Sequence, residues 1–489
     1  MRTRMAIWSG KMAGALSKSM GNDGTTIPGV IARKVDPHFL RHLRKTAKTI
    51  IYITGTNGKT TTANLAAHLL RFAGKKVIAN LEGSNMVTGL SAALVRQTPL
   101  VGWRVNEIAV MEVDEASLPK VVSECAPDYL IVTNFFRDQL DRYGEVDLLI
   151  KKMKESLRTF DIKLILNGDD PFVHRFSSLQ KENIYVGLDA NACPFQSYSM
   201  AESKYCPECQ NELTYTTIHY GQLGHYKCSC GFSRPEPNFS VEKVDNGIQG
   251  VRLSVDGVSY PTTLKGMYNA YNALLAITMC RTLGIDSKYI QEGLVSYHKG
   301  NGRMQEFSIN GVKWKLNLVK NPAGANVTLS EYMLTKEKKQ FIFCLNDELA
   351  DGEDISWIWD IDLEMVNRSE IDIYIASGKR AYDVALRMKY AGVPSEKIMI
   401  LPNLKEAVFY TKSKALPTYV MATYTCLSPL ISILSRETDK LEKGDENIGT
   451  ATIPLLPRYL KPVWGQRKYH MFKKTMRMAG NYSSSRRNK

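Results

Sequence analysis

The sequence predicts an α/β protein in which a large, mostly parallel sheet is interrupted by a cysteine-rich insertion and is followed by a smaller α/β domain. Short β-rich runs alternate with helically spaced apolar segments over residues 49–190 and again over 310–435. The stretch of about 190–240 breaks this rhythm and holds the four of the nine cysteines that are clustered. A length of 489 residues also allows about three domains.

The first elements follow from local patterns. Residues 1–48 form a helical lead-in with small and basic side chains. Residues 49–300 form a central domain, with the insertion at about 190–240 and helices at Thr60–Phe72 and Gly266–Leu283. Its strands are short apolar runs, typical of strands covered on both faces. We expect them at Ile50–Ile53, Lys76–Ala79, Ile108–Val113, Tyr129–Thr133 and Leu164–Leu166.

The second α/β region occupies residues 301–436, and a basic, partly ordered tail follows at 437–489. Strands are expected at Gln340–Leu345, Ile371–Ala376, Ile398–Leu401 and Thr418–Tyr424. The uncharged stretch Ala415–Ser435 contains Pro417 and Pro429, so it predicts a buried strand and a proline turn instead of a membrane span.

The positive charge is concentrated at the end of the chain. The net charge is +15, and residues 451–489 contribute ten basic and no acidic side chains, which leaves +5 for the first 450 residues. The globular part therefore gives no indication of nucleic-acid binding. The tail could adhere to an anionic membrane surface or to RNA, or could aid solubility. Basic residues interrupt any apolar signal-peptide core, so we expect a cytoplasmic protein, with peripheral contact to the inner face of the membrane as an option.

A glycine-rich turn predicts an ATP site. The segment Gly55-Thr56-Asn57-Gly58-Lys59-Thr60-Thr61 follows a strand and opens a helix. In such loops backbone N–H groups and the helix N-terminus bind phosphate, the lysine (Lys59) reaches the outer phosphates, and the hydroxyl of Thr60 can hold Mg²⁺.

Four cysteines predict a structural zinc site. Cys206, Cys209, Cys228 and Cys230 have the spacing C-x2-C-x18-C-x-C, which can deliver four thiolates to one Zn²⁺. His219 or His225 could replace one ligand. The insertion has few basic residues, so a stiffening module is a better interpretation than a nucleic-acid ribbon.

An acidic loop follows the strand expected at Gln340–Leu345. Its carboxylates surround Trp357 and Trp359, and the carboxyl ends of strands are where α/β sheets place chemistry. A solvated loop with packed tryptophans is the alternative. The carboxylates are Asp347, Asp351, Asp354 and Asp360.

The loop TGTNGKTTT resembles that of the Mur ligase and folylpolyglutamate synthetase superfamily, which activates a carboxylate as an acyl phosphate for attack by an amine. Further segments resemble the superfamily in the same order: MEVDE with Glu112, TNFFRDQLD, NGDDP, the helix GMYNAYNA with Asn269 and Asn272, and GRMQ with Arg303. The resemblance implies that Glu112 holds Mg²⁺, that Asn272 contacts adenine and that Arg303 contacts phosphate.

The sequence also departs from the superfamily's usual residues at Gln139, Gln305 and Asn317. These departures, the four clustered cysteines and the stretch DGEDISWIWD together resemble the MurT subunit family of lipid II isoglutaminyl synthase. That resemblance implies ATP-dependent amidation of the α-carboxylate of D-Glu in the lipid II stem peptide, as part of peptidoglycan synthesis. It also implies ammonia from a separate GatD-type glutaminase, in a heterodimer or larger complex. Asp354 would complete the glutaminase's Cys–His pair, with Asp351 as the alternative.

Two other functions remain open. A stand-alone Mur or folylpolyglutamate-type amino acid ligase is disfavoured because Gln139, Gln305 and Asn317 replace residues usual in those enzymes. A zinc-ribbon nucleic-acid-binding ATPase is disfavoured by the charge distribution. The sequence also lacks the G-x-C-x-G elbow of a class I glutaminase, so ammonia must come from another chain.

Overall fold

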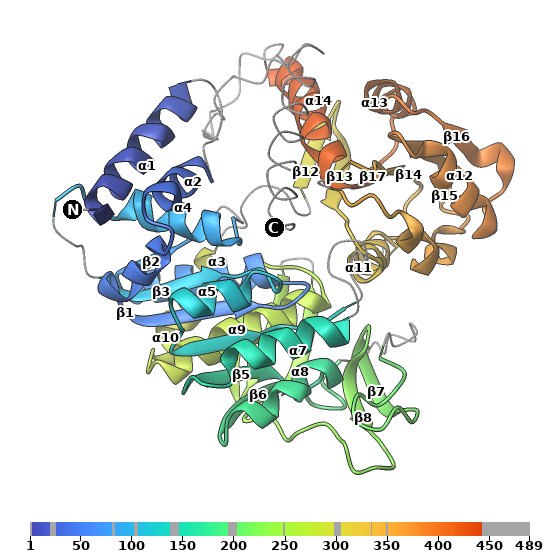
Figure 1. Ribbon diagram of the computed structural model, residues 1–489. Helices are drawn as coiled ribbons and strands as arrows, with labels where there is room; N and C mark the ends of the chain where they lie inside the picture. Colours follow the sequence, from blue (N-terminus) through green and yellow to red (C-terminus); the bar gives the residue numbers. More distant parts are fainter. Residues whose placement is uncertain are drawn as a thin grey trace, which may run out of the picture.

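Two sheets organise the chain in the computed structural model (Figure 1). The structure describes residues 2–19, 26–80, 84–101, 106–136, 146–193, 203–247, 250–297, 305–333, 335–348 and 351–442. The first sheet has nine strands, the second has six, and a separate two-stranded hairpin lies beside the first. The expected α/β class is confirmed, with parallel strands in the majority of pairings.

The first sheet runs in the order β11-β10-β9-β6-β5-β4-β1-β3-β2. Strands from β2 to β9 along this order pair in parallel, whereas β10 and β11 are antiparallel additions at one edge. The strands are β1 (Ala47–Thr54), β2 (Val77–Ala79), β3 (Asn106–Glu112), β4 (Tyr129–Val132), β5 (Lys163–Asn167), β6 (Asn183–Leu188), β9 (Phe239–Gly247), β10 (Gly250–Val255) and β11 (Val258–Pro261).

Helices cover both faces of this sheet. Along β1, Ile51 and Ile53 point into one core while Ile50 and Tyr52 point into the other, as the alternation of a strand requires. The first core is closed by α3 (Lys59–Phe72), α9 (Met267–Thr282) and α10 (Ser287–Ser296). The second is closed by α4 (Val87–Gln97), α5 (Leu118–Glu124), α7 (Val146–Leu157) and the short α8 (Pro171–His174) and η2 (Arg175–Leu179).

The N-terminal helices extend the layer formed by α4. Helix α1 (Arg2–Ser19) packs on α2 (Ile27–Val35), which packs on α4, and the turn η1 (Phe39–Lys45) leads into β1. In Figure 1 this group lies at the blue end of the chain, beside β2 and β3.

The second sheet runs in the order β12-β13-β17-β14-β15-β16, and only β12 is antiparallel to its neighbour. The strands are β12 (Gln305–Ile309), β13 (Val312–Leu318), β14 (Lys339–Cys344), β15 (Ile371–Ser377), β16 (Ile398–Ile400) and β17 (Thr418–Ala422). One face is covered by α11 (Pro322–Tyr332), η3 (Ser356–Asp360), η4 (Leu363–Val366) and α12 (Ala381–Tyr390), and the other by α13 (Leu404–Ser413) and α14 (Tyr424–Glu442), with the turn η5 (Ser395–Lys397) before β16.

The proline turn expected after β17 is wrong. Pro429 lies inside α14, which continues to Glu442. A proline inside a helix removes one backbone hydrogen bond. The helix persists because Leu427, Leu430 and Leu434 recur at helical spacing and are buried against the second sheet. The basic residues after position 442 lie outside the described part of the chain.

The strand order places a site at one edge of the first sheet. Strand β1 lies between β3 and β4, so the chain leaves β1 at a point where the strand order reverses. In open α/β sheets such a switch point, at the carboxyl ends of the strands, is where ligands bind. Among the described helices, none is both long enough and apolar enough to cross a membrane.

Candidate functional site

The loop between β1 and α3 can be built only with glycine at two positions. Gly58 has φ +84°, and a Cβ there would lie 2.0 Å from Oδ1 of Asn272. Gly55 has φ +120°, and its Cβ would lie 2.3 Å from Oγ1 of Thr133. The positive φ values and the close approaches explain both glycines, and they press the loop against α9 and against the end of β4.

Lys59 is buried at the start of α3 and its ammonium group faces its own loop. Nζ donates to the carbonyl oxygens of Gly55 at 2.5 Å and Thr56 at 3.2 Å, and to Oε1 of Glu115 at 2.8 Å. Burial disfavours the charged form, but the carboxylates of Glu115 and Glu112 outweigh it and raise the pKa of Lys59 above its usual value. The lysine is therefore a cation held at the phosphate loop.

Glu112 ends β3 beside this lysine, and two asparagines fix its position. Its Oε1 accepts from Nδ2 of Asn85 at 2.9 Å, and its backbone N–H donates to Oδ1 of Asn80 at 2.8 Å. Asn80 also donates to the carbonyl oxygen of Glu112 at 2.9 Å. The side chain is buried and close enough to Lys59 to raise the pKa of the lysine.

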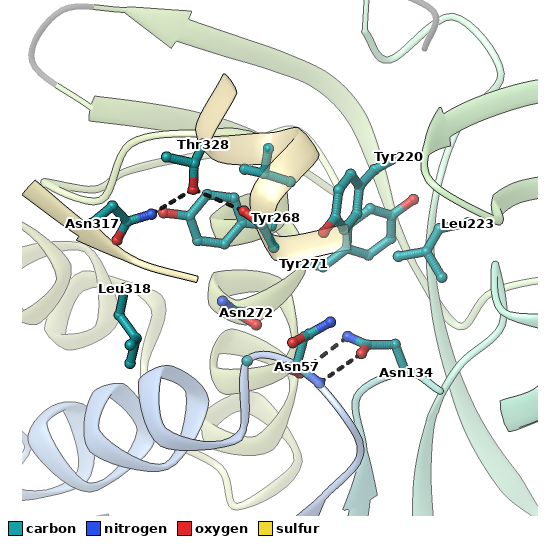
Figure 2. A pocket seen from close by; sticks show the side chains of 13 residues that line it. Asn57, Asn134, Tyr220, Leu223, Tyr268, Tyr271, Asn272, Asn317, Leu318 and Thr328 are labelled. Carbon is teal, nitrogen blue, oxygen red and sulfur yellow. Dashed lines mark hydrogen bonds between the residues drawn. The ribbon is translucent and has the colours of Figure 1, made fainter. Parts of the chain in front are cut away.

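A pocket opens next to the loop (Figure 2). The space between its atoms is about 560 Å³, including the part open to solvent. Nδ2 of Asn57 is buried at the pocket and makes no hydrogen bond to the described residues. An unpaired buried donor is costly, and an acceptor on a ligand would satisfy it. The lining residues include Asn57, Gly58, Asn134, Tyr220, Leu223, Tyr268, Tyr271, Asn272, Asn317 and Thr328.

The pocket joins the two sheet domains. Nδ2 of Asn321, at the start of α11, donates to Oδ1 of Asn57 in the phosphate loop at 3.1 Å. Asn134 fixes the same loop residue, because its Oδ1 accepts from the Asn57 backbone N–H at 2.9 Å. Asn272 accepts from Oγ1 of Thr62 at 3.3 Å and donates to Asn269 at 3.0 Å. Asparagines of both domains, Asn134 and Asn272 in the first and Asn321 in the second, therefore lie against the phosphate loop.

The inserted hairpin supplies part of the wall. Strands β7 (Thr214–Tyr220) and β8 (Leu223–Lys227) end next to the pocket, where the Tyr220 ring lies 5.4 Å from that of Phe136. The Tyr220 hydroxyl donates to the carbonyl oxygen of Ala323 in α11 at 3.3 Å. Gln222 donates to the backbone of Phe135 and to the carboxylate of Asp170 at 3.2 Å. The hairpin thus touches both domains.

The Asn167–Pro171 segment holds these parts together. Asp170 is fully buried, caps α8 and accepts from the backbone N–H of Phe135 at 2.8 Å. Burial raises the pKa of Asp170 to about 7. Asp169 accepts from Nε of Arg234 at 2.6 Å and from the hydroxyl of Tyr271 at 2.8 Å. Both carboxylates support the walls of the pocket from behind.

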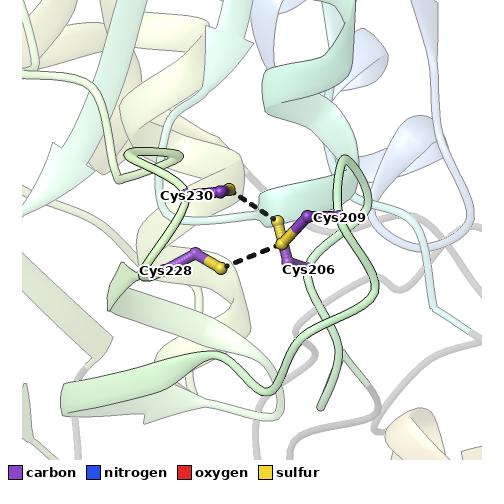
Figure 3. A group of neighbouring side chains, drawn as sticks. All are labelled: Cys206, Cys209, Cys228 and Cys230. Carbon is purple, nitrogen blue, oxygen red and sulfur yellow. Dashed lines mark hydrogen bonds between the residues drawn. The ribbon is translucent and has the colours of Figure 1, made fainter.

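The four clustered cysteines meet at the base of the hairpin (Figure 3). Their sulfur atoms all lie within 4.8 Å of one another, with 3.7 Å from Cys206 to Cys230 and 3.4 Å from Cys209 to Cys228. Zn–S bonds of about 2.3 Å in a tetrahedron require S–S separations of roughly 3.8 Å. The thiols therefore fit a Zn²⁺ ion. His225 instead donates from Nε2 to the carbonyl oxygen of Leu188 at 2.7 Å.

Two acidic residues in the loop after β14 differ in their surroundings. Asp351 is buried, and its oxygens accept from the backbone N–H and the hydroxyl of Thr425 at 2.8 and 2.5 Å. It ties the loop to the start of α14. Asp354 is half-buried, and only its Oδ1 is engaged, by the backbone N–H of Ser356 at 2.8 Å. Within the described residues Oδ2 of Asp354 has no hydrogen-bond partner.

Several expected residues thus meet at one place and others do not. The phosphate loop, Lys59, Glu112 and Asn272 converge, while the cysteine cluster lies at the end of the hairpin away from Tyr220, and Asp354 follows β14 in the second domain. Arg303 and Gln139 lie outside the described residues. Glu115, which pairs with Lys59, was not anticipated, although it stands within the same MEVDE segment as Glu112.

Comparison with known proteins adds independent findings. A model of the Mur ligase middle domain matches residues 53–280, and a model of the MurT ligase C-terminal region matches residues 318–427. The chain is 40% identical over 437 residues to the lipid II isoglutaminyl synthase (glutamine-hydrolyzing) subunit MurT of Staphylococcus aureus strain COL, covering 89% of this chain and 98% of that one. The Streptococcus pneumoniae strain R6 protein of the same name is 33% identical, with coverage of 89% and 97%.

Solved structures share the fold. The pseudomurein peptide ligase type C of Methanothermus fervidus superimposes with a TM-score of 0.61 at 24% identity, over 79% of this chain and 78% of that one. The folylpolyglutamate synthase of Mycobacterium tuberculosis does so with a TM-score of 0.54 at 13% identity, over 88% and 95%. The fold is thus that of the Mur ligases, and with 40% identity over nearly the whole of a MurT subunit, the chain belongs to the MurT family of lipid II isoglutaminyl synthase subunits.

Proposed function

We propose that this chain is the ATP-dependent synthetase subunit that converts the α-carboxylate of D-Glu in the lipid II stem peptide to an amide. The names of its MurT relatives support this class of reaction. The observation that carries the proposal is the convergence of a phosphate loop, a buried lysine and a buried carboxylate at the switch point of the first sheet. Beside them lies a pocket that the second domain closes.

The phosphate groups of ATP would bind at the Gly55–Thr61 loop. Lys59 would exchange its loop carbonyl partners for phosphate oxygens, and the N-terminus of α3 would add its partial positive charge. The nucleoside would occupy the adjacent pocket, where Asn272 and the unpaired Nδ2 of Asn57 can contact it. Arg303 remains the expected further phosphate contact.

Thr60 and Glu112 are the residues that would hold Mg²⁺. Oxygen ligands of this kind suit the ion, and Glu112 is a buried carboxylate that Asn80 and Asn85 keep in place. When bound, Mg²⁺ would neutralise part of the charge on the phosphate oxygens.

The chemistry would proceed in two steps. A carboxylate oxygen of D-Glu attacks the γ-phosphorus, the bond to ADP breaks, and an acyl phosphate forms. The lone pair of ammonia then attacks the carbonyl carbon, the bond to phosphate breaks, and the nitrogen loses a proton to give the amide. The main contribution of the protein would be positioning and electrostatic stabilisation of the transferring phosphoryl group by Lys59.

The cysteines of this chain do not fit a glutaminase. A nucleophilic cysteine is a partly exposed thiol with a lowered pKa. Burial instead raises the pKa of the Cys280 and Cys426 thiols to about 12, and it raises the pKa of Cys344 and of Cys125 above the usual value. Cys193 is also buried and the other four belong to the cluster. Ammonia would therefore come from a separate GatD-type glutaminase.

A surface beside Asp354 supports docking of that partner. Trp359 is 47% exposed and its ring lies 5.5 Å from that of Tyr390, which is 70% exposed on α12. Leu386 and Tyr382, one and two helical turns earlier, are also exposed. Aromatic residues of this kind are enriched at protein interfaces. The unengaged Oδ2 of Asp354 could there accept from the imidazole of the partner's catalytic histidine.

The cysteine cluster would hold one structural Zn²⁺. Four thiolates close the coordination sphere, so the ion would stabilise the hairpin and take no part in the reaction. Because ATP is the phosphoryl donor, the reaction would take place in the cytoplasm, with lipid II presented at the inner face of the membrane.

The test is reconstitution with the glutaminase. We expect the co-expressed complex to convert lipid II to its amide when ATP and glutamine are supplied. Mass spectrometry of lipid II detects this conversion as the mass change from acid to amide. A complex carrying Lys59→Ala should give no product. Absence of amidation by the wild-type complex, with ATP hydrolysed and lipid II unchanged, would overturn the proposal.

A further inference from the structure

The outer face of α1 carries large apolar side chains that no described residue covers. Met5 is 61% exposed, Trp8 51%, Met12 67% and Leu16 62%. Their spacing of three, four and four residues places them in one stripe along the helix, which we call the α1 stripe. Single exposed apolar residues are ordinary, but a contiguous row of four large ones indicates a contact surface.

The inner face of α1 is already packed, so the helix cannot turn to bury the stripe. Ala6, Ile7, Gly10 and Ser17 are buried, and Ile7 lies in the core beneath the helix. A Cβ on Gly10 would lie 2.7 Å from the carbonyl oxygen of Pro28, and one on Gly14 would lie 3.0 Å from the Pro28 ring. This close approach to α2 leaves no room for a methionine or a tryptophan at either glycine. The side chains of the stripe therefore point outward as a consequence of the packing.

The surroundings of the stripe are basic. Residues 1–48 contain two acidic side chains, Asp23 and Asp36, and ten basic ones: Arg2, Arg4, Lys11, Lys18, Arg33, Lys34, Arg41, Arg44, Lys45 and Lys48. Three of the basic side chains form ion pairs, Arg33 with Glu124, Arg41 with Asp36 and Arg44 with Asp128, whereas four of the others belong to α1 itself. On α1 itself, Arg2 donates to the carbonyl oxygen of Val35 and Lys11 to that of Arg96, contacts that leave their charges in place. The region therefore complements an anionic partner and repels a second copy of itself.

We propose that α1 lies on an anionic lipid surface, with the α1 stripe inserted at the level of the headgroups and the basic residues facing lipid phosphates. An apolar helix face with a central tryptophan and flanking lysine and arginine is the usual form of an interfacial helix. The exposed stripe and the positive charge support lipid binding whether or not the proposed reaction takes place. Only the benefit of such contact, proximity to a lipid-linked substrate, rests on the proposed function.

The packing of the helices connects this surface to the site. Helix α1 packs on α2, and α2 packs on α4. Gly29 of α2 is so close to α4 that a Cβ would lie 1.9 Å from the carbonyl oxygen of Thr88. Helix α4 begins at Val87, two residues after Asn85, which binds Glu112. A chain lying on a membrane through α1 would thus hold the phosphate site two helices above the lipid surface.

The experiment measures co-sedimentation of the full-length chain with vesicles. Wild type should bind vesicles containing phosphatidylglycerol, bind pure phosphatidylcholine vesicles weakly, and lose affinity as salt rises. The double variant Trp8→Gln/Met12→Gln should bind at least tenfold more weakly. The matched control is Tyr289→Gln/Val295→Gln, which removes two exposed apolar side chains, 51% and 53% exposed, from α10. It should bind like wild type.

Two further measurements separate the alternatives. A variant without residues 443–489 should keep the part of the binding that depends on Trp8 and Met12, which separates α1 from the basic tail. Size-exclusion chromatography of the α1 variant tests whether a second copy covers the stripe instead. Equal vesicle binding by wild type and the α1 variant, with or without a change in oligomeric state, would overturn the proposal.

The outcome is independent of the reaction. Thermal unfolding should be the same in wild type and the α1 variant, because the substituted side chains are exposed. Amidation of a water-soluble, short-chain lipid II analogue should also be unchanged in the variant complex. If the wild-type complex amidates no substrate, the proposed function fails while vesicle binding still decides the role of α1.

Discussion

At the scale of single residues, the central feature is that Lys59 already has partners before any nucleotide binds. Its ammonium group is bound by two loop carbonyls and by Glu115. These contacts keep a buried cation in place at low cost, since a buried charge without partners would be strongly destabilising. ATP binding would then be an exchange of partners, in which phosphate oxygens replace oxygens of the protein.

Replacing the lysine tests this exchange. Lys59→Ala should abolish amidation in the complex while leaving partner binding intact, because the hydrogen bonds of the side chain to described residues go to its own loop and to Glu115. Rates of amide formation measure the effect, and size-exclusion chromatography checks the complex. Lys120→Ala, an exposed lysine on α5, is the matched control and should be fully active. Undiminished turnover in Lys59→Ala would contradict the assignment of the loop to ATP.

Glu115 competes with the phosphate oxygens of ATP for Lys59, so it should weaken ATP binding. Glu115→Gln keeps the size of the side chain but removes the charge that competes with phosphate for Lys59. We expect the KM for ATP to fall by up to about tenfold, or about 1.4 kcal/mol, with the fold retained. Steady-state kinetics measure it, with Glu107→Gln, an exposed carboxylate on β3, as control. A raised KM would mean that Glu115 assists nucleotide binding.

Asp170 predicts a pH dependence of stability. Burial raises its pKa from 3.8 to about 7 in the folded protein, so the folded state binds this proton more tightly than the unfolded chain. The contribution to the free energy of unfolding is fully present below pH about 4 and is lost as pH rises through about 7. Asp170→Asn should show a flatter profile than wild type in urea unfolding between pH 5 and 8. Parallel profiles would place the pKa of Asp170 in its ordinary range.

At the scale of elements, the inserted hairpin has more contacts than its sequence suggests. The insertion was expected to be a stiffening module, yet Tyr220 and Leu223 line the pocket and Gln222 binds Asp170 behind it. One end of the hairpin carries the four cysteines, and the other end contacts Phe136, the start of α8 and α11. Order at the cysteine end therefore supports the wall at the pocket end.

Metal analysis and ligand substitution test this coupling. We expect one Zn²⁺ per chain, and Cys206→Ser should lower the thermal unfolding temperature, because metal binding contributes directly to folding of such modules. The KM for ATP should rise, whereas kcat at saturating ATP should remain close to wild type. Ser229→Ala, between two cluster residues, is the control. A fully stable, metal-free wild-type protein would refute the site.

Elements with a regular apolar period could be predicted from the sequence, and tertiary contacts could not. The unit of β1, the phosphate loop and α3 could be predicted because its pattern is local. A β-rich run is followed by Gly55 and Gly58, whose positive φ values favour glycine, and then by a helical pattern. The turn predicted at Pro429 was wrong because prolines usually end helices, whereas the leucines of α14 are buried against strands that are distant in the sequence. Tyr220 was beyond reach for a similar reason, since no local pattern says where an inserted hairpin folds back.

At the scale of the whole molecule, the pocket and the Asp354 loop use different residues of the second domain. Helix α11 closes the pocket through Asn321 and Ala323. The loop after β14 leads into η3, which packs on the same face of the sheet as α11, but neither this loop nor η3 contributes to the described lining of the pocket. The proposed synthetase and glutaminase contacts can therefore be removed separately.

Asp354→Asn should produce a crossed result with Lys59→Ala. An amide cannot stabilise an imidazolium as a carboxylate does, so glutamine hydrolysis by the complex should be lost. High ammonium should restore amidation in Asp354→Asn but not in Lys59→Ala. Asp351→Asn serves as comparison, and it should lower stability, because Asp351 binds the start of α14. Equal glutaminase rates in wild type and Asp354→Asn would show that this carboxylate has no catalytic role.

If the cysteine cluster holds zinc as proposed, the hairpin that links it to the pocket makes ATP binding depend on the zinc supply of the cell. A chain made during zinc starvation would have an intact sequence, a normal phosphate loop and a loosened pocket wall at Tyr220 and Leu223. Its output would then depend on the energy charge of the cell, falling most where ATP is scarce and recovering where ATP is abundant. Trace-metal supply and cell-wall chemistry would be joined through a single β-hairpin.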